Sequence, residues 1–369
     1  MQRISIIKKI KLTIAKAILN FIFALRKIFS KKQDSAIKKE KPKILLFFMS
    51  PGIGDAIMAT FLISGLNKIF PDCEIDILSS AGARIIENNP LIHNIEIVSK
   101  EEQHNLKLLV KRLHHLRARH YDAAIDIPWS WEGYSAERAA FLYAIGAKNV
   151  YAANMPGFSF ITNIFWDYPA ETVIDIYEKA LKTLVLQKNS AKKINFKRSY
   201  QIIIPQNEEN IVLDYLSANG LKSYAVINPK GSLAQRCISI EKTIKLATNL
   251  AMSGTDIVLI NCRKVKTDNA HLEKYGKILN FDGNIWQIAA LVKHSSETIT
   301  VDTSTIHIAD AWSKPVLALY SENNGFGNRY VWKTHAPISP QNIVLHSYLA
   351  EDIPDDEIIS AAKKLINGL

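Results

Sequence analysis

Three short polar segments of this sequence combine residue types that bind anions or move protons. Residues 51–55 (PGIGD) place a carboxylate, Asp55, behind two glycines that allow a close backbone approach. Residues 228–232 (NPKGS) hold a lysine, a glycine and a serine, and Arg236 follows shortly after. Residues 302–307 (DTSTIH) add an aspartate, three hydroxyls and a histidine. Each segment follows an apolar run and precedes a helical pattern, so each is expected where a strand ends and a helix begins.

Asp55 has two interpretations from the sequence. At a helix start it can be the N-cap, a common structural role that stabilises a helix by about 1 kcal/mol. Beyond the carboxyl end of a strand, its carboxylate can instead face a ligand and act as a general base. The spacing is not the dinucleotide fingerprint, because Ile57 occupies the third glycine position. A nicotinamide-dependent enzyme is therefore disfavoured.

The other two segments suit a phosphate or a nucleotide. The free amides of a helix start bind anions, and the hydroxyls of residues 303–305 can join them. His307 would lie one turn into that helix, while Lys230 and Arg236 supply positive charge for a diphosphate. The structural alternatives are a Ser/Thr cap with a packed histidine, and a solvated turn at 228–232.

Apolar runs and helical patterns alternate along the chain after Pro42, which is typical of βαβ units in a parallel sheet with helices on both faces. We expect strands over residues 43–48, 74–79, 121–127, 223–228, 255–260, 297–301 and 315–320. We expect helices over residues 55–69, 104–118, 134–146, 171–187, 207–218, 239–253, 285–293 and 305–313.

The polar, basic stretch 188–198 looks like a linker between two halves. We therefore expect a tail (1–42), a doubly wound domain (43–190) and a second doubly wound domain (200–369), with the two domains facing a cleft. The last helix belongs to the second domain or packs back on the first. Ligands of such sheets bind beyond the carboxyl ends of the strands, where all three polar segments are expected.

Composition narrows the classes of protein. The chain has 369 residues, 48% of them apolar and 22% charged, which is ordinary globular usage. Its cysteines, Cys73, Cys237 and Cys262, form no C-x-x-C pair, so a cysteine zinc site or a disulfide framework is not expected and a reducing compartment fits. No D-x-D motif that would bind a metal stands out at a strand end, and we expect neither a metal nor a cofactor.

The net charge of +11 belongs to the N-terminal tail. Residues 1–43 hold 13 of the 46 Lys and Arg but only two of the 35 Asp and Glu. The rest of the chain is therefore neutral, and its composition does not indicate a nucleic-acid surface. A nucleic-acid binder is accordingly a poor interpretation of the basic isoelectric point.

Residues 4–29 mix apolar and basic side chains at helical spacings of three and four. The longest uncharged run, 17–25, is too short to span a bilayer, which takes about 20 residues. We expect a basic amphipathic helix on the anionic inner face of the cytoplasmic membrane, with residues 30–43 as a polybasic tether. Packing of this helix on the protein itself, or a frayed tail, is the alternative.

Further ligand-binding candidates are Trp129 and Trp131, whose aromatic faces can stack on a sugar, and the basic helix that includes Lys111. That helix could hold the acidic groups of a ligand. Loop packing of the tryptophans and a solvated basic face are the structural alternatives.

The three segments, in this order, resemble glycosyltransferase family 9, the lipopolysaccharide heptosyltransferases. The resemblance spans residues 43–325 and includes KILLFF, GIGDAIMAT, IFPDCEIDIL, YDAAIDI and INPKGS. Its most specific part is IWQIAALVKHSSETITVDTSTIHIADAWSKPVLALYS, where the family has D-(S/T)-G-x-x-H followed by a helix and a Lys/Arg-Pro strand.

This resemblance implies an α/β GT-B fold and an inverting, metal-independent transfer of heptose from ADP-heptose to the lipopolysaccharide inner core or lipid A-Kdo. It implies that Asp55 is the catalytic base and that Gly52 and Gly54 lie on the acceptor side. The donor-binding positions that it implies are Gly231, Ser232, Asp302, Thr303 and His307, with Arg236 near the family's usual Lys or Arg. We expect Lys230 and Ser304 to bind the donor beside them, and Trp129, Trp131 and Lys111 to lie on the acceptor side.

The sequence departs from the family pattern at three positions. Ser304 replaces the usual glycine, Cys237 stands where a tryptophan often follows the basic residue, and Ser321 replaces a glycine after the LALY strand. Two alternatives therefore stay open. One is a family member that uses another nucleotide sugar for O-antigen, capsule or core. The other is a non-enzymatic, membrane-tethered sugar-nucleotide binder.

Overall fold

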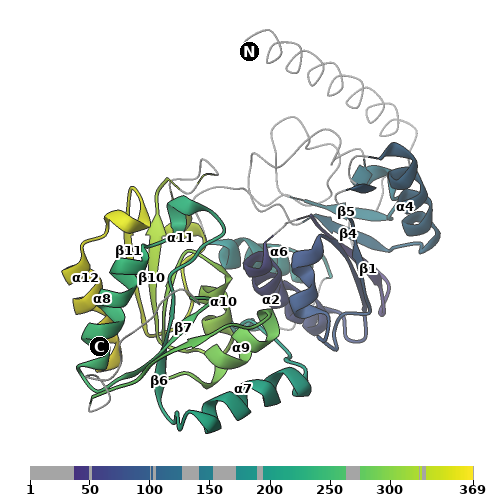
Figure 1. The fold of residues 1–369 in the computed structure, drawn as a ribbon. Helices are drawn as coiled ribbons and strands as arrows, with labels where there is room; N and C mark the ends of the chain where they lie inside the picture. The colour runs from purple at the N-terminus through teal and green to yellow at the C-terminus, as the bar shows by residue number, and fades with distance from the viewer. Residues whose placement is uncertain are drawn as a thin grey trace. The chain divides into compact units, whose positions relative to one another are not determined.

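A computed structural model describes residues 37–49, 52–99, 101–102, 105–126, 141–152, 172–188, 194–262, 275–323, 325 and 330–368. The tail helix expected over residues 4–29 lies outside this part of the chain. By contacts the chain divides into two units, each built around its own sheet (Figure 1). Unit 1 comprises residues 1–51, 62–169 and 174–196, and unit 2 comprises residues 52–61, 170–173 and 197–369.

Unit 1 contains a five-stranded sheet in which every pairing is parallel, in the order β3-β2-β1-β4-β5. Its strands are β1 (Lys43–Phe48), β2 (Glu74–Ser79), β3 (Asn94–Ile97), β4 (Ala123–Asp126) and β5 (Asn149–Tyr151). Its central strand β1 is almost entirely buried, as expected for a strand with neighbours on both sides and helices on both faces.

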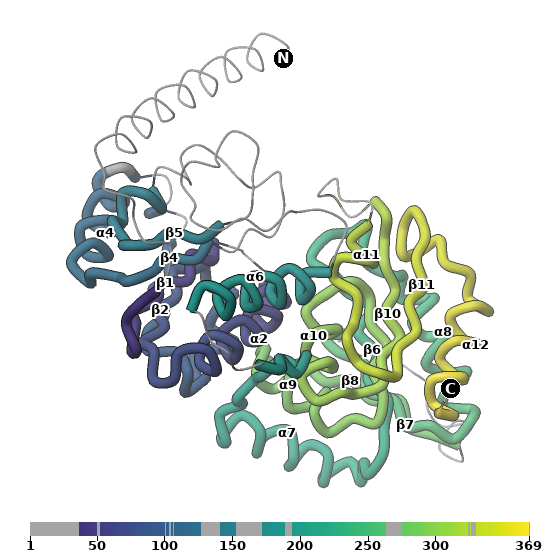
Figure 2. The backbone as a smooth tube through the Cα atoms, turned by 180° about the vertical axis from the view of Figure 1, so that it is seen from behind, coloured from purple at the N-terminus to yellow at the C-terminus, as the bar shows by residue number. Residues whose placement is uncertain are grey.

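In the described part of unit 1, the helices α2 (Ile53–Ile69), α4 (Leu106–Ala118) and α6 (Val173–Gln187) accompany this sheet. Figures 1 and 2 show α4 on the opposite face of the sheet from α2 and α6. This placement follows from right-handed crossovers, because the connection from β1 to β2 and the connection from β3 to β4 run in opposite directions across the sheet.

Unit 2 contains a six-stranded parallel sheet in the order β11-β10-β9-β6-β7-β8. The strands are β6 (Tyr224–Asn228), β7 (Asp256–Ile260), β8 (Ile278–Phe281), β9 (Glu297–Val301), β10 (Val316–Ser321) and β11 (Asn342–Ser347). The helices are α7 (Gln206–Ala218), α8 (Ile240–Ala251), α9 (Ile285–His294), α10 (Ser304–Ala311), α11 (Val331–Thr334) and α12 (Asp355–Ile366).

Both faces of the second sheet are covered (Figure 2). On one face, alternate strand residues such as Ile227, Leu259 and Leu319 pack with α8 and α12 in a single apolar cluster. The helices α9 and α10 lie on the other face, with α7 beside α9. Each fully buried leucine or isoleucine contributes about 1.5–3 kcal/mol, so this double covering fixes the sheet that carries the polar loops.

The expected α/β architecture is confirmed: the chain forms two parallel doubly wound sheets. Strand bounds at 43–48, 74–79 and 297–301 match the expectation, and the other expected strands shift by one or two residues. Four strands were missed, namely β3, β5, β8 and β11. The expected helix at 134–146 lies mostly outside the described residues, of which 141–144 are helical. The last helix, α12, packs against α8 within unit 2.

Within the described part of the chain, no helix combines the length and apolar character that crossing a bilayer requires.

Candidate active site

Two polar loops of unit 2 begin side by side where its strand order reverses. Strands β6 and β9 are neighbours, with Asn228 opposite Thr300, but they lead to strands on opposite sides of the sheet. Residues 228–236 and 302–307 therefore leave the same edge of the sheet together. In doubly wound sheets this switch point is where ligands bind.

Hydrogen bonds tie the two loops to each other. Asn228 Nδ2 donates to Thr305 Oγ1 at 2.8 Å, which links the end of β6 to the first turn of α10. Asn228 Oδ1 accepts from the Lys230 amide at 3.3 Å, and Lys230 Nζ donates to the Asn261 carbonyl at 3.0 Å. The exposed Lys230 therefore spans the ends of β6 and β7, with its charge at the loop surface.

The 228–236 loop closes tightly around a glycine. A Cβ atom at Gly231 would lie 2.7 Å from Arg236 Cβ and 3.4 Å from the Asp302 carbonyl oxygen. A side chain at position 231 would therefore push this loop away from the 302–307 loop. The neighbouring Ser232 is exposed, so its hydroxyl lies at the surface of the loop.

Arg236 and Asp302 form a largely buried ion pair at the switch point. Arg236 Nη1 lies 3.2 Å from Asp302 Oδ2, and the two side chains are 12% and 10% exposed. Burial raises the pKa of the Asp302 carboxyl, and the positive charge of Arg236 opposes that rise. The negative charge of Asp55 raises the same pKa, which places Asp55 within electrostatic range of the loop.

The first turn of α10 offers backbone amides to an anion. Thr303 is the N-cap in extended conformation, and among the described residues its side chain makes no capping hydrogen bond. Thr303 and Ser304 are both half-buried. The amides of this turn are therefore not capped by the hydroxyl that precedes them, which suits a phosphate oxygen.

His307 is buried inside unit 2. Its ring packs edge-on against Tyr200, with centroids 5.9 Å apart, and its Nδ1 lies 3.5 Å from Asp310 Oδ2. A Cβ atom at Gly54 would lie 2.8 Å from His307 Cδ2, so a glycine lets the start of α2 approach α10. His307, in α10, thus contacts Tyr200 and the start of α2. It is a packed histidine, as the structural alternative has it, and it also belongs to the 302–307 loop.

Asp55 is the third residue of α2, in the first turn of that helix. It is therefore inside the helix, and the N-cap interpretation is wrong. The first turns of α2 belong by contacts to unit 2, together with the anion loops. Asp55 Oδ1 lies 3.6 Å from His335 Nε2, and the Asp55 side chain is 18% exposed. The carboxylate is thus largely shielded from water and lies beside a second titratable group.

The acceptor candidates are divided between the two units: Gly52 and Gly54 belong by contacts to unit 2, and Lys111 belongs to unit 1. Gly52 directly precedes α2, and Gly54 lies in its first turn. Trp129 and Trp131 lie outside the described residues. They follow β4, which is the neighbour of β1 at the point where the strand order of unit 1 reverses. The polar segment after β1 and the two tryptophans after β4 therefore leave adjacent strands.

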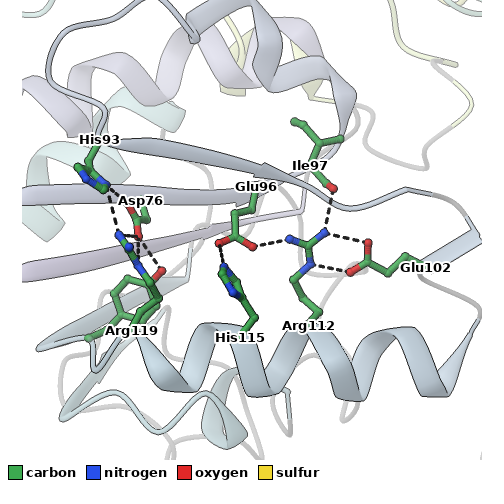
Figure 3. Close-up of polar contacts among 9 residues, drawn as sticks. Asp76, His93, Glu96, Ile97, Glu102, Arg112, His115 and Arg119 are labelled. Carbon is green, nitrogen blue, oxygen red and sulfur yellow. Dashed lines mark hydrogen bonds and ion pairs between the residues drawn. The ribbon is translucent and has the colours of Figure 1, made fainter.

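Two basic residues of helix α4, and Arg119 directly after it, are engaged within unit 1 (Figure 3). Arg112 pairs with Glu96 and with Glu102, and His115 Nε2 lies 2.8 Å from Glu96 Oε1. Arg119 Nη2 donates to the buried Asp76 at 2.8 Å. These cations hold α4 on the sheet.

Asp76 is the most buried of the three carboxylates that these contacts involve. Besides Arg119 it accepts from the Tyr121 hydroxyl and contacts His93 Nδ1, each at 2.8 Å. The hydrogen bond from Tyr121 to this carboxylate, together with burial, raises the pKa of the tyrosine hydroxyl above its ordinary range. Lys111 is exposed on α4, and its proposed contact with an acceptor rests on that exposure.

Metal ligands and reactive thiols do not gather in the part of the chain that the structure describes. There, no group of three or more His, Cys, Asp or Glu side chains is arranged to hold a metal ion. Burial raises the pKa of the Cys73 thiol to about 11, and it also raises the pKa of Cys262. These two cysteines are therefore protonated at neutral pH and are poor nucleophiles.

The fold of this chain is similar to that of two solved glycosyltransferases. The chain superposes on a glycosyltransferase family 9 protein from Veillonella parvula with a TM-score of 0.70 and 17% identity, over 90% of this chain and 100% of that one. It superposes on ADP-heptose lps heptosyltransferase II of Escherichia coli with a TM-score of 0.65 and 16% identity, over 88% and 98%. The fold is therefore that of the GT-B glycosyltransferases.

The family follows from the sequence match. Residues 109–352 match the family model described as glycosyltransferase family 9 (heptosyltransferase). The chain belongs to glycosyltransferase family 9. A curated relative, putative lipopolysaccharide heptosyltransferase 4 of Escherichia coli K12, is 27% identical over 174 residues, which are 46% of this chain and 47% of the relative. The match thus spans about half the length of that relative.

His335 is the site residue that the sequence did not indicate. It follows the four-residue helix α11 and belongs to no recognisable motif, so only its position beside Asp55 identifies it. A histidine after a short aromatic segment carries no sequence signal that separates it from the other nine histidines of the chain.

Proposed function

We propose that this protein is an inverting, metal-independent glycosyltransferase that moves heptose from ADP-heptose to the inner core of lipopolysaccharide. Membership of the heptosyltransferase family supports the class of reaction. The observation that carries the proposal is the place of Asp55: its shielded carboxylate lies in the same unit as the Arg236–Asp302 pair and the start of α10. This arrangement supports a proposed base and a proposed anion site that act together.

Asp55 removes the proton of the acceptor hydroxyl in this proposal. A carboxylate in the first turn of a helix is stabilised in its ionised form, which makes it a weaker base. An alcohol is a poor acid, so the proton must move as the new glycosidic bond forms. The low exposure of Asp55 opposes the effect of the helix, because shielding from water favours the protonated carboxyl.

The departing diphosphate is stabilised by fixed positive groups of unit 2. These are the first amides of α10, the exposed Lys230 and the guanidinium of Arg236, which Asp302 holds in place. Helix-start amides and cations of this kind compensate charge that develops in the transition state. The proposed metal independence rests on this set of charges. We assign donor binding to the domain at 200–369 and acceptor binding to the domain at 43–190.

The test is turnover of purified protein with ADP-heptose and with other nucleotide sugars, using truncated lipopolysaccharide as acceptor. We expect transfer from ADP-heptose, and we expect it to persist in EDTA. Loss of all activity in EDTA would contradict metal independence. Binding of nucleotide sugars without transfer from any of them would instead favour the non-enzymatic binder.

A second candidate is a family member with a different nucleotide sugar as donor. Ser304 favours it, because this half-buried side chain stands in the first turn of α10 where the family has glycine. A side chain there changes the space beside a donor phosphate. The same donor series separates the two candidates, because preferred transfer from another nucleotide sugar selects the second.

We also propose that the protein lies on the inner face of the cytoplasmic membrane through its basic tail. Residues 1–43 hold the excess positive charge of the chain, and each cation near an anionic surface contributes about 1 kcal/mol. Removing residues 1–36 should abolish sedimentation with vesicles that contain anionic lipid. Equal sedimentation of full-length and shortened protein would rule this out.

A further inference from the structure

A second titratable side chain, His335, lies beside Asp55. His335 Nε2 lies 3.6 Å from Asp55 Oδ1, and the two side chains are 16% and 18% exposed. This separation is too long for a good hydrogen bond but falls within ion-pair distance. The two groups are therefore coupled by charge, and a proton on the ring turns the contact into an ion pair.

Thr334 sets which ring nitrogen faces Asp55. Its Oγ1 lies 2.8 Å from His335 Nδ1 and 3.4 Å from the Val331 carbonyl oxygen. In the tautomer in which this hydroxyl donates to the Val331 carbonyl, it accepts from Nδ1–H. The ring then presents the lone pair of Nε2 to Asp55, which is the arrangement of a proton acceptor.

The backbone that carries the ring is anchored by buried groups. The hydroxyl of Tyr320, a fully buried residue, donates to the His335 carbonyl at 2.7 Å. Asp310 Oδ1 accepts from the amides of Ile338 and Ser339 at 2.9 and 2.8 Å, which holds the chain just beyond. These anchors come from β10 and α10, which also border the loops at residues 228–236 and 302–307.

A stacked aromatic pair anchors the other end of α11. Trp332 lies parallel to the His346 ring, with centroids 4.1 Å apart and an interplanar angle of 8°. His346 Nδ1 in turn contacts Glu322 Oε1 at 2.9 Å. A helix of four residues could not hold a ring in place alone, and these contacts supply the rigidity that a positioned catalytic group needs.

We propose that His335 is a positioning residue for Asp55 and the second acceptor of the proton that leaves the acceptor hydroxyl. This inference rests on the proposed function, in which Asp55 is the base. Imidazole is intrinsically a stronger base than a carboxylate, and the first turn of α2 favours the ionised form of Asp55. A proton taken up by Asp55 can therefore pass to the ring when the two atoms, 3.6 Å apart here, approach to hydrogen-bond distance.

The step balances without a further reactant. The acceptor O–H bond breaks as its oxygen bonds to the sugar, and the bond from the sugar to the diphosphate breaks with its electron pair on the diphosphate. The proton moves to Asp55 Oδ1 and then to His335 Nε2. The imidazolium releases it to water after the products leave, which restores the neutral ring.

Other charged groups near the pair come from several elements. Asp302 and His307 stand at the end of β9 and in α10, Arg236 is the last residue of η4 (Ala234–Arg236), and the titratable but neutral hydroxyl of Tyr320 lies in β10. Arg236 pairs with Asp302, so these two largely cancel. Asp55 is then the negative charge that balances a proton on His335.

The kinetic test compares wild type with His335→Gln and His335→Gly in single-turnover transfer from ADP-heptose to truncated lipopolysaccharide. We expect a rate loss of about 10- to 100-fold, a donor KM within about threefold of wild type, and a shifted acidic limb of the pH–rate profile. Added imidazole should restore part of the rate of His335→Gly. His294→Gln is the matched control, because His294 also pairs with a carboxylate, Glu209 at 2.7 Å, in the same unit.

A rate within twofold of wild type in His335→Gln would overturn the inference. So would a rate loss with an unchanged pH profile and no rescue by imidazole, since a merely structural histidine behaves in that way. If Asp55→Asn keeps full activity, the proposed role of Asp55 as the base fails, and the inference fails with it. Loss of activity in Asp55→Asn with normal His335 variants removes only the present inference.

A second readout needs no substrate. The ring resonance of His335, identified in the nuclear magnetic resonance spectrum by its absence in His335→Gln, should change its pH response in Asp55→Asn. The corresponding resonance of His294 should stay the same. An unaltered response of His335 would show that the two groups are not coupled, and would overturn the inference without reference to any donor.

Discussion

Substitutions in the buried pair of Arg236 and Asp302 should change the stability of the fold and the transfer rate by different amounts. Replacing Arg236 by methionine keeps the volume of the side chain but leaves the Asp302 carboxyl without its cation. Removing one partner of a fully buried pair costs about 3–5 kcal/mol. Both side chains here keep a tenth of their surface exposed, so we expect roughly 2–3 kcal/mol at pH 8.

The stability lost in Arg236→Met should be larger at high pH than at low pH. Burial raises the pKa of Asp302 above its unfolded value, and removing Arg236 takes away the largest opposing charge. A group of this kind stabilises the fold fully below its unfolded pKa, and that stability is lost as pH rises through the folded pKa. Arg236→Met should therefore be closer to wild type at pH 5 than at pH 8.

Urea unfolding at both pH values measures this difference, and the double variant Arg236→Met/Asp302→Asn is its control. The double variant should recover most of the stability, because no charge is left unpaired. Its transfer rate should still be about 100-fold below wild type, because the diphosphate has lost a cation. Two results would refute the reasoning. One is a free energy of unfolding for Arg236→Met that is less than about 0.5 kcal/mol below wild type at pH 8, because surface substitutions commonly have effects of that size. The other is a double variant that is no more stable than Arg236→Met.

Three further predictions follow from single contacts. Gly54→Ala should destabilise unit 2 by about 1–3 kcal/mol and lower the transfer rate, because the new Cβ would lie 2.8 Å from His307 Cδ2. An unchanged melting temperature would count against this packing. Burial raises the pKa of Glu297 to about 7, so its stabilising effect should be lost between pH 4.5 and 7. Glu297→Gln should then be more stable than wild type at pH 8 by about 1–2 kcal/mol, allowing for partial exposure, and equal unfolding curves at pH 8 would argue against this. Asp76→Asn should cost about 2–3 kcal/mol in urea unfolding, because Arg119 loses a charged partner; a loss below about 0.5 kcal/mol would show that the network contributes little.

The central strands of both sheets could be predicted from sequence, whereas the outermost strands could not. The missed strands β3, β5, β8 and β11 are the four sheet edges. An edge strand has one neighbour and partial exposure, so it is short or mixed in character; β5 has three residues, and β11 is mostly half-buried. Runs such as β1 and β10, buried on both faces, are continuous apolar segments that the sequence displays directly.

The candidate site could be predicted in part, because its loops follow central strands. Ends of adjacent parallel strands meet at one edge, so residues 228–236 and 302–307 come together once β6 and β9 are known to be neighbours. Sequence alone did not show that Arg236 pairs with Asp302, that His307 packs against Gly54, or that His335 reaches Asp55. Those contacts depend on packing between elements far apart in the chain, and no spacing rule encodes them.

The most direct test of the account is the single-turnover rate of Asp55→Asn, measured at saturating ADP-heptose alongside its affinity for ADP. The substitution keeps the size of the side chain and removes its basicity. The account predicts a rate at least about 100-fold below wild type with an ADP affinity within about threefold, because Asp55 acts on the acceptor proton and not on the nucleotide. A folded Asp55→Asn protein that transfers heptose within twofold of the wild-type rate would contradict it.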